Sequence, residues 1–88
     1  RMRAVVSVMG KDDIGILAKV SGACAKANAS IDEVTQSILD DYYAMIMLVK
    51  SDKINVPFDE FRKLITESVP GMAVQVMHED IFKSMHRV

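Results

Sequence analysis

The chain is poor in several residue types that mark particular classes of protein. Its 88 residues include one cysteine, no tryptophan and two prolines, and aromatic residues make up 6% of the total. The single cysteine, Cys24, excludes an internal disulfide and suits a reducing compartment, so we expect a cytoplasmic protein. The net charge is only −1, with the basic residues spread along the chain. Direct binding of nucleic acid is therefore not expected.

Long hydrophobic runs are also missing. No apolar stretch approaches the roughly 18 residues that span a membrane, and no signal-peptide pattern opens the chain, so no membrane association is expected. Half of the residues are nevertheless hydrophobic and 26% are charged, which is typical of a folded globular domain. Residues 2–88 form one small domain in this interpretation. Because so small a core leaves apolar surface exposed, we expect a homo-oligomer, most simply a dimer.

The spacing of apolar residues predicts an alternation of strands and helices. Arg3 to Met9 is short and β-branched, and the following helix carries the apolar stripe Leu17, Val20, Cys24 and Ala27, which makes Cys24 a core thiol. The full series is a strand over 3–9, a helix over 15–28, a hairpin of strands over 30–39 and 42–50, a helix from Pro57 to Ser68, a strand over 72–79 and a short helix over 81–86. A bulge or bend near Asp32 would explain the imperfect alternation of its strand.

This order predicts an α+β, ferredoxin-like β-α-β-β-α-β fold, with two helices on one face of a four-stranded antiparallel sheet and a short C-terminal helix. The other face starts uncovered. Alternation along the strands suggests which side chains point where. The helix side is expected to receive Val6, Val8, Ile46, Leu48, Val74 and Val76, while the open face and a subunit interface are expected to receive Met9, Met45, Met47 and Met77.

The turn Asp12-Asp13-Ile14-Gly15 joins the first strand to the first helix. The first N–H groups of a helix lack intrahelical partners and can bind an anion, and Gly15 has no Cβ to block close approach to its backbone. A small ligand could be held here. Spacing alone favours a structural interpretation, in which Asp12 or Asp13 caps the helix and the glycine permits the turn.

Catalysis is not expected, because a catalytic site needs a base or nucleophile held by partners. His78, His86 and Cys24 have no recognisable partners in the sequence. The residues His78-Glu79-Asp80 make a poor metal site, since neighbours on a strand point to opposite faces, and neither a metal nor a cofactor is expected. A ferredoxin-like acylphosphatase is not expected, because that class needs an arginine in the first loop and this loop is acidic. An RNA-recognition domain is not expected either, because that class needs aromatic residues on the open face, where methionines are predicted here.

With this order established, the chain resembles the ACT domain, a small regulatory module attached to, or acting on, enzymes of amino-acid metabolism. The family has Asp-Arg-Pro-Gly and an apolar pair at the first turn, and Asp12, Gly15, Ile16 and Leu17 match this pattern, with Asp13 and Ile14 at the other two positions. Before the second strand the family has Gly, an apolar residue, Asn and Ile. Here Asn28-Ala29-Ser30-Ile31 stands at these positions, so a serine replaces the asparagine.

The resemblance covers nearly the whole chain. In particular, the chain resembles small stand-alone single-ACT proteins related to the glycine cleavage system repressor. It implies that a small effector, usually an amino acid, binds between the first turn of one subunit and its neighbour, at Asp12, Gly15 and Ser30. A metabolic enzyme or a transcription factor would then be regulated. The alternative is an interaction module that regulates its target without a ligand. Dimers joined edge to edge or face to face both remain open.

Overall fold

The computed structural model describes residues 2–11 and 14–86. Its elements are β1 (Arg3–Gly10), α1 (Ile16–Lys26), β2 (Ser30–Leu39), β3 (Tyr42–Lys50), α2 (Phe58–Ser68), β4 (Ala73–His78) and α3 (Glu79–Met85). This order confirms the predicted ferredoxin-like arrangement with a short helix after the last strand. None of the helices in the described part of the chain combines the length and the apolar character that crossing a bilayer requires.

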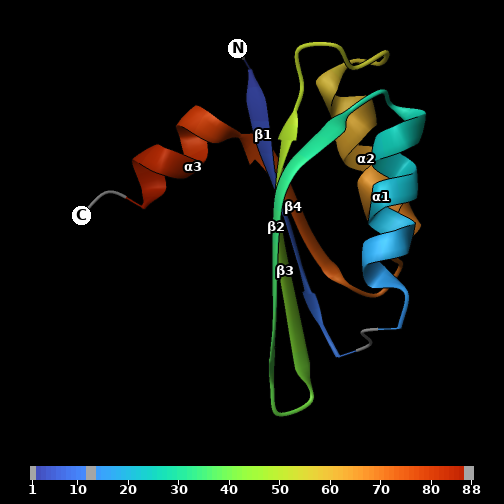
Figure 1. Cartoon of the computed structure of the whole chain (residues 1–88), viewed down its shortest axis with the longest axis vertical. Coiled ribbons are helices and arrows are strands. Elements are labelled where there is room, and N and C mark those ends of the chain that lie inside the picture. The colour runs from blue at the N-terminus through green and yellow to red at the C-terminus, as the bar shows by residue number, and fades with distance from the viewer. Residues whose placement is uncertain (1, 12–13, 87–88) are drawn as a thin grey trace.

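The four strands form one antiparallel sheet in the order β2-β3-β1-β4, so β1 and β3 are central and β2 and β4 are the edges. Figure 1 shows α1 and α2 together on one side of the sheet and α3 on the other. The pairing of β2 with β3 shifts register between Ile31 and Glu33, which confirms the predicted irregularity near Asp32. At the far end the hairpin turns at Asp40, whose φ is 57°. This hairpin extends past the helix layer (Figure 1).

Helices α1 and α2 begin and end within two residues of the predicted bounds, whereas α3 begins at Glu79, two residues before the predicted Ile81. Helix α1 follows Gly15, which has a φ of 68°, and stops before Asn28, which has a φ of 62° and occupies the left-handed position that commonly ends a helix. Ile16 is buried in the first turn of α1, whereas Leu17 is 37% exposed, so the buried stripe begins one residue earlier than predicted. Helix α2 follows Pro57 and carries acidic residues in its first turn, where they favour the helix dipole.

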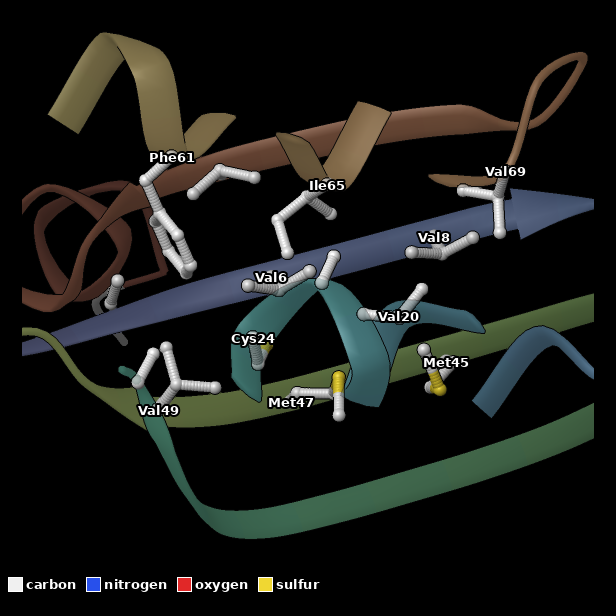
Figure 2. Close-up of a cluster of buried hydrophobic side chains, with 14 of the residues drawn as sticks. Val6, Val8, Val20, Cys24, Met45, Met47, Val49, Phe61, Ile65 and Val69 are labelled. Carbon is white, nitrogen blue, oxygen red and sulfur yellow. The ribbon is translucent and has the colours of Figure 1, made fainter. Parts of the chain in front are cut away.

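The core lies between this helix pair and one face of the sheet (Figure 2). Val6 and Val8 of the central strand β1 meet Val20 of α1 and Ile65 of α2, and all four side chains are fully buried. The other residues labelled in Figure 2 are also buried: Cys24, Met45, Met47, Val49, Phe61 and Val69. A core of this kind stabilises the domain mainly by removing apolar area from water.

The side chains of strand β3 that point toward the helices are the opposite set from the one predicted. Directly paired residues of antiparallel strands lie on the same side of a sheet, and Met47 pairs with Val6 while Met45 pairs with Val8. Both methionines are fully buried under the helices, whereas Ile46 is 44% exposed on the open face. The prediction that Met45 and Met47 lie on the open face, and Ile46 and Leu48 on the helix side, is therefore wrong. Nearly every residue from Tyr42 to Val49 is apolar, so the strand carried no alternation from which its face could be read.

Candidate functional site

The β1–α1 turn leaves the start of α1 accessible. Asp12, a predicted ligand residue, lies outside the described residues, as does Asp13. Gly15 is exposed and has the left-handed φ of 68°, and no side chain among the described residues caps the helix. Among the described residues, a Cβ built on Gly15 would meet only Cε of Lys19, at 3.9 Å. The described residues therefore leave space beside the glycine, and its left-handed backbone conformation disfavours any other residue.

Gly10, at the start of the same turn, has a structural role instead. A Cβ there would lie 2.5 Å from Sδ of Met72, closer than non-bonded atoms approach, so the absence of a side chain lets β1 and the segment before β4 pack together. The two glycines of this turn therefore differ in kind. Gly15 permits a backbone conformation, whereas Gly10 permits a contact.

Ser30 lies at the other end of α1, at the start of the edge strand β2. It is exposed and lines a polar recess of about 330 Å³ together with Asn28, Lys50, Asp52 and Lys53. Nδ2 of Asn28 donates a hydrogen bond to the carbonyl oxygen of Lys53 at 2.9 Å, which fixes one wall of the recess. The recess thus offers a hydroxyl group, two ammonium groups and a carboxylate.

Gly15 and Ser30 do not come together within one chain. Helix α1 separates them, and its eleven residues span roughly 16 Å at the usual rise per residue. Figure 1 shows the start of α1 and the start of β2 at opposite ends of the helix layer. A single site containing both residues would therefore have to combine two subunits.

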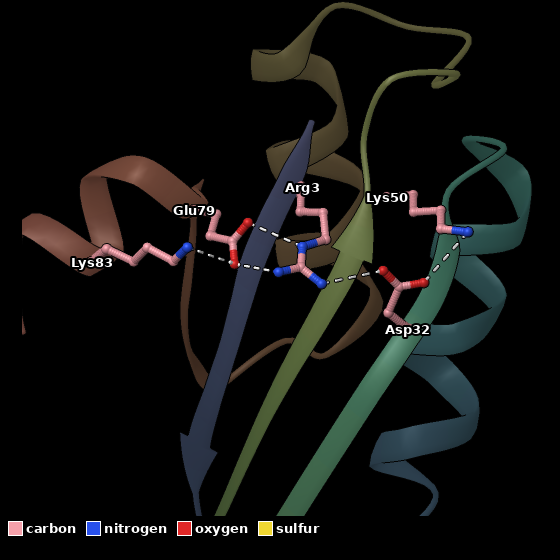
Figure 3. Close-up of polar contacts among 5 residues, drawn as sticks. All are labelled: Arg3, Asp32, Lys50, Glu79 and Lys83. Carbon is pink, nitrogen blue, oxygen red and sulfur yellow. Dashed lines mark hydrogen bonds and ion pairs between the residues drawn. The ribbon is translucent and has the colours of Figure 1, made fainter. Parts of the chain in front are cut away.

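A chain of ion pairs joins α3 to the sheet (Figure 3). Nε and Nη2 of Arg3 donate hydrogen bonds of 3.0 and 2.7 Å to the two carboxylate oxygens of Glu79. Lys83 lies 3.7 Å from Glu79, and Asp32 lies 3.7 Å from both Arg3 and Lys50. The bond from Arg3 lowers the pKa of Glu79, and the bond to Glu79 raises the pKa of Arg3. A bidentate arginine–carboxylate pair fixes direction as well as distance, so it sets where α3 begins.

Beneath α3 lies an apolar groove of about 250 Å³ on the open face of the sheet. Its apolar walls include Val5, Ile46, Leu48 and Phe82, and Glu33, Thr35, Glu79 and Lys83 also line it. Val5 is only 3% exposed because α3 packs against this end of the face. No sequence pattern predicts the groove or the Arg3–Glu79 pair.

The chain is similar to known proteins of one family. The sequence profile of the ACT domain matches residues 3–77, which is most of the chain. The chain belongs to the ACT-domain family. A UPF0237 protein of Methanocaldococcus jannaschii is 44% identical to it over 98% of each chain.

Solved structures agree with this assignment. An ACT domain protein from Streptococcus pneumoniae is 32% identical, with a TM-score of 0.76 over 97% of this chain and 98% of that one. A putative glycine cleavage system transcriptional repressor shares the fold, with a TM-score of 0.70 and 16% identity, and the present chain spans 45% of its length. This ACT domain therefore covers nearly the whole of its curated relatives and less than half of the repressor.

The reactive side chains of this ACT domain are engaged in packing. Cys24 is fully buried, and desolvation raises the pKa of its thiol to about 11, so it is not an activated nucleophile. His78 stacks on Phe58 with ring centroids 4.0 Å apart, and Nδ1 of His86 lies 2.9 Å from the carbonyl oxygen of Phe82. Within residues 2–11 and 14–86, no three side chains of His, Cys, Asp or Glu are placed to hold a metal ion together.

Proposed function

We propose that the protein is a small regulatory module that binds an amino acid, or a similar small zwitterion, at the boundary between two subunits and so modulates amino-acid metabolism or its transcription. Membership of the ACT family supports the regulatory role. Likeness in fold to a putative transcriptional repressor of the glycine cleavage system is compatible with either kind of target. No catalytic role is assigned to any residue.

The observation that carries the proposal is the open start of α1. Its first N–H groups suit a carboxylate, and the bare backbone of Gly15 lets a ligand approach them. Ser30 adds a hydroxyl group that can donate or accept, and Asp12 is assigned to the ammonium group of the ligand. A zwitterion can interact favourably with all three groups, whereas a simple anion would be repelled by the negative charge of Asp12.

Edge-to-edge pairing of β2 strands would bring these groups together. Two β2 strands that pair antiparallel about a two-fold axis place the beginning of one beside the end of the other. Ser30 of the partner subunit then lies toward the end of the molecule that carries Gly15, while the two residues of one chain stay at opposite ends of α1. The effector would stabilise this pairing because it binds only the paired state.

Thermal-shift screening with the common amino acids at millimolar concentration tests the proposal. One amino acid should raise the Tm, and Asp12→Ala should weaken its binding by ~1 to 3 kcal/mol through the lost ammonium contact. Ser30→Ala should weaken binding as well. Ser84→Ala is its matched control, because Ser84 is also exposed but lies on α3, away from β2 and α1.

A ligand-free interaction module remains the second candidate, and the apolar open face favours it. If no amino acid shifts the Tm, or if Ser30→Ala binds the amino acid as well as Ser84→Ala does, the effector proposal is wrong. The regulatory role would then depend on protein contacts alone.

A further inference from the structure

The groove of about 250 Å³ beneath α3 is separate from the proposed effector site, since it shares no lining residue with the recess at Ser30. Val5, Ile46 and Leu48 lie on the central strands and give the groove an apolar floor. Phe82 contributes an aromatic ring from α3. The volume is just below the ~300 Å³ at which pockets for drug-sized molecules begin. The groove therefore suits a ligand smaller than a typical drug, with an apolar body.

Three charged side chains line this groove, and two carboxylates against one ammonium group give the lining a net charge of −1. Glu79 and Lys83 lie 3.7 Å apart and neutralise each other (Figure 3). Arg3 is also taken up, by its two hydrogen bonds to Glu79 and by Asp32 at 3.7 Å. The carboxylate of Glu33 forms neither an ion pair nor a hydrogen bond with any residue of the described part of the chain. It is therefore the charged group that a ligand in the groove can use.

The bulge in β2 brings Glu33 to the groove. Ile31 and Val34 both pack against the core on the helix side, although residues three apart in a regular strand point to opposite faces. The register shift between them leaves Asp32 and Glu33 toward the open face, where Asp32 joins the ion pairs of Figure 3 and Glu33 lies opposite Leu48. Bulges often redirect a side chain beside a functional site. Here the bulge places a carboxylate at the end of an apolar floor.

We propose that this groove binds a small primary amine with an apolar body, whose ammonium group contacts the carboxylate of Glu33. The apolar body lies on the floor of the groove and against the ring of Phe82. An ammonium group gains a charge-assisted hydrogen bond from Glu33, and an aromatic ring attracts cations as well as apolar groups. An acid would instead meet the net negative charge of the lining. The site goes beyond the proposed function and does not depend on it.

Phenethylamine is the probe, titrated into the isotopically labelled full-length protein while the amide chemical shifts are followed by NMR. A ligand of this size should bind with a Kd on the order of 1 mM. The shift changes should concentrate around Glu33, Leu48 and Phe82 and should be absent from α1 and α2. Phenethyl alcohol keeps the ring and lacks the charge, so it should bind roughly tenfold more weakly or worse. Hydrocinnamic acid, which carries the opposite charge, should bind more weakly still.

Substitutions separate this site from the effector site. Glu33→Gln should weaken amine binding by roughly tenfold, whereas Glu60→Gln, the same change on an exposed residue of α2, should leave the Kd unchanged. Ile46→Ala should also weaken binding, because it removes part of the floor, and it provides the result if Glu33→Gln fails to fold. Met9→Ala is its control, since Met9 is exposed on a neighbouring strand and does not line the groove. Ser30→Ala should bind the amine normally, whatever it does to an amino-acid effector.

Five results would each overturn the proposal. They are the absence of localised shifts at ~10-fold above the expected Kd, equal binding of the amine and the alcohol, tighter binding of hydrocinnamic acid or phenylalanine than of the amine, equal Kd values for Glu33→Gln and Glu60→Gln, and loss of amine binding in Ser30→Ala. The last result would place the amine at the effector site. Normal amine binding without any response to amino acids would instead contradict the effector proposal alone.

Discussion

Two methionines that sequence reasoning placed on the same face give a direct test of which face β3 buries. Met47→Ala removes three heavy atoms from a side chain that is fully buried, whereas Met9→Ala removes the same atoms from one that is 52% exposed. The lost transfer free energy at Met47 is roughly 2 kcal/mol, and the cavity left between Val6 and the helices adds to it. We therefore expect Met47→Ala to lower the free energy of unfolding by ~3 kcal/mol.

That loss is a large share of the total, since a domain of this size is stable by ~5 to 15 kcal/mol. It should lower the Tm by roughly 12 to 24 °C, whereas Met9→Ala should cost less than ~1 kcal/mol. Urea unfolding followed by circular dichroism, at one low protein concentration for both variants, measures the difference. If Met9→Ala proves the costlier change and Met47→Ala leaves the midpoint unaltered, the assigned register and face of β3 are wrong.

Three further changes have outcomes that the structure fixes in direction. Just before α1, Gly15→Ala should destabilise the fold by ~1 to 2 kcal/mol because Gly15 has a left-handed φ. Within α1, Gly22→Ala should stabilise the fold by ~0.5 to 1 kcal/mol, because no atom of the described residues lies within 4 Å of the added Cβ; thermal unfolding of both variants checks this. The thiol of Cys24, buried and with its pKa raised to about 11, should react with an aromatic disulfide reagent far more slowly in the native protein than in urea; comparable rates would show that the thiol is accessible. The bond from Arg3 holds the pKa of Glu79 below its ordinary value of 4.5, so the pair stabilises the fold above that pH and the contribution is lost as the pH falls through the lower folded pKa. The Tm of the parent and of Glu79→Gln should therefore differ at neutral pH and converge in acid, and parallel curves would contradict the role of the pair.

The strands and helices could be predicted because their local patterns agree with their surroundings. Val6 and Val8 alternate in β1, and Val74 and Val76 alternate in β4, and both pairs lie on the helix side as predicted. The face of β3 could not be predicted in this way. Its apolar residues lie at both odd and even positions, so they point to both faces of the sheet. Only the register of its pairing with β1 shows that Met47 lies under the helices.

The features around the candidate site depend on distance in space. Arg3 and Glu79 are 76 residues apart, so no local pattern indicates their pairing. Gly15 was identified because its residue type and position in the turn carry the signal themselves. Ser30 was identified through the family pattern, but only the length of α1 shows that it lies far from Gly15 in the same chain.

The position of β1 in the sheet has a consequence for how the chain folds during synthesis. β1 is the first strand to be made, yet one of its two neighbours, β4, is the last. Until residue 78 has been synthesised, the edge of β1 that β4 will cover stays unpaired, and exposed strand edges invite association between nascent chains. Pairing of β1 with β4 also closes most of the chain into a loop, and such distant contacts slow folding. We therefore expect the domain to complete its folding only after β4 has been synthesised. The synthesis of β4 would then determine the yield of folded protein.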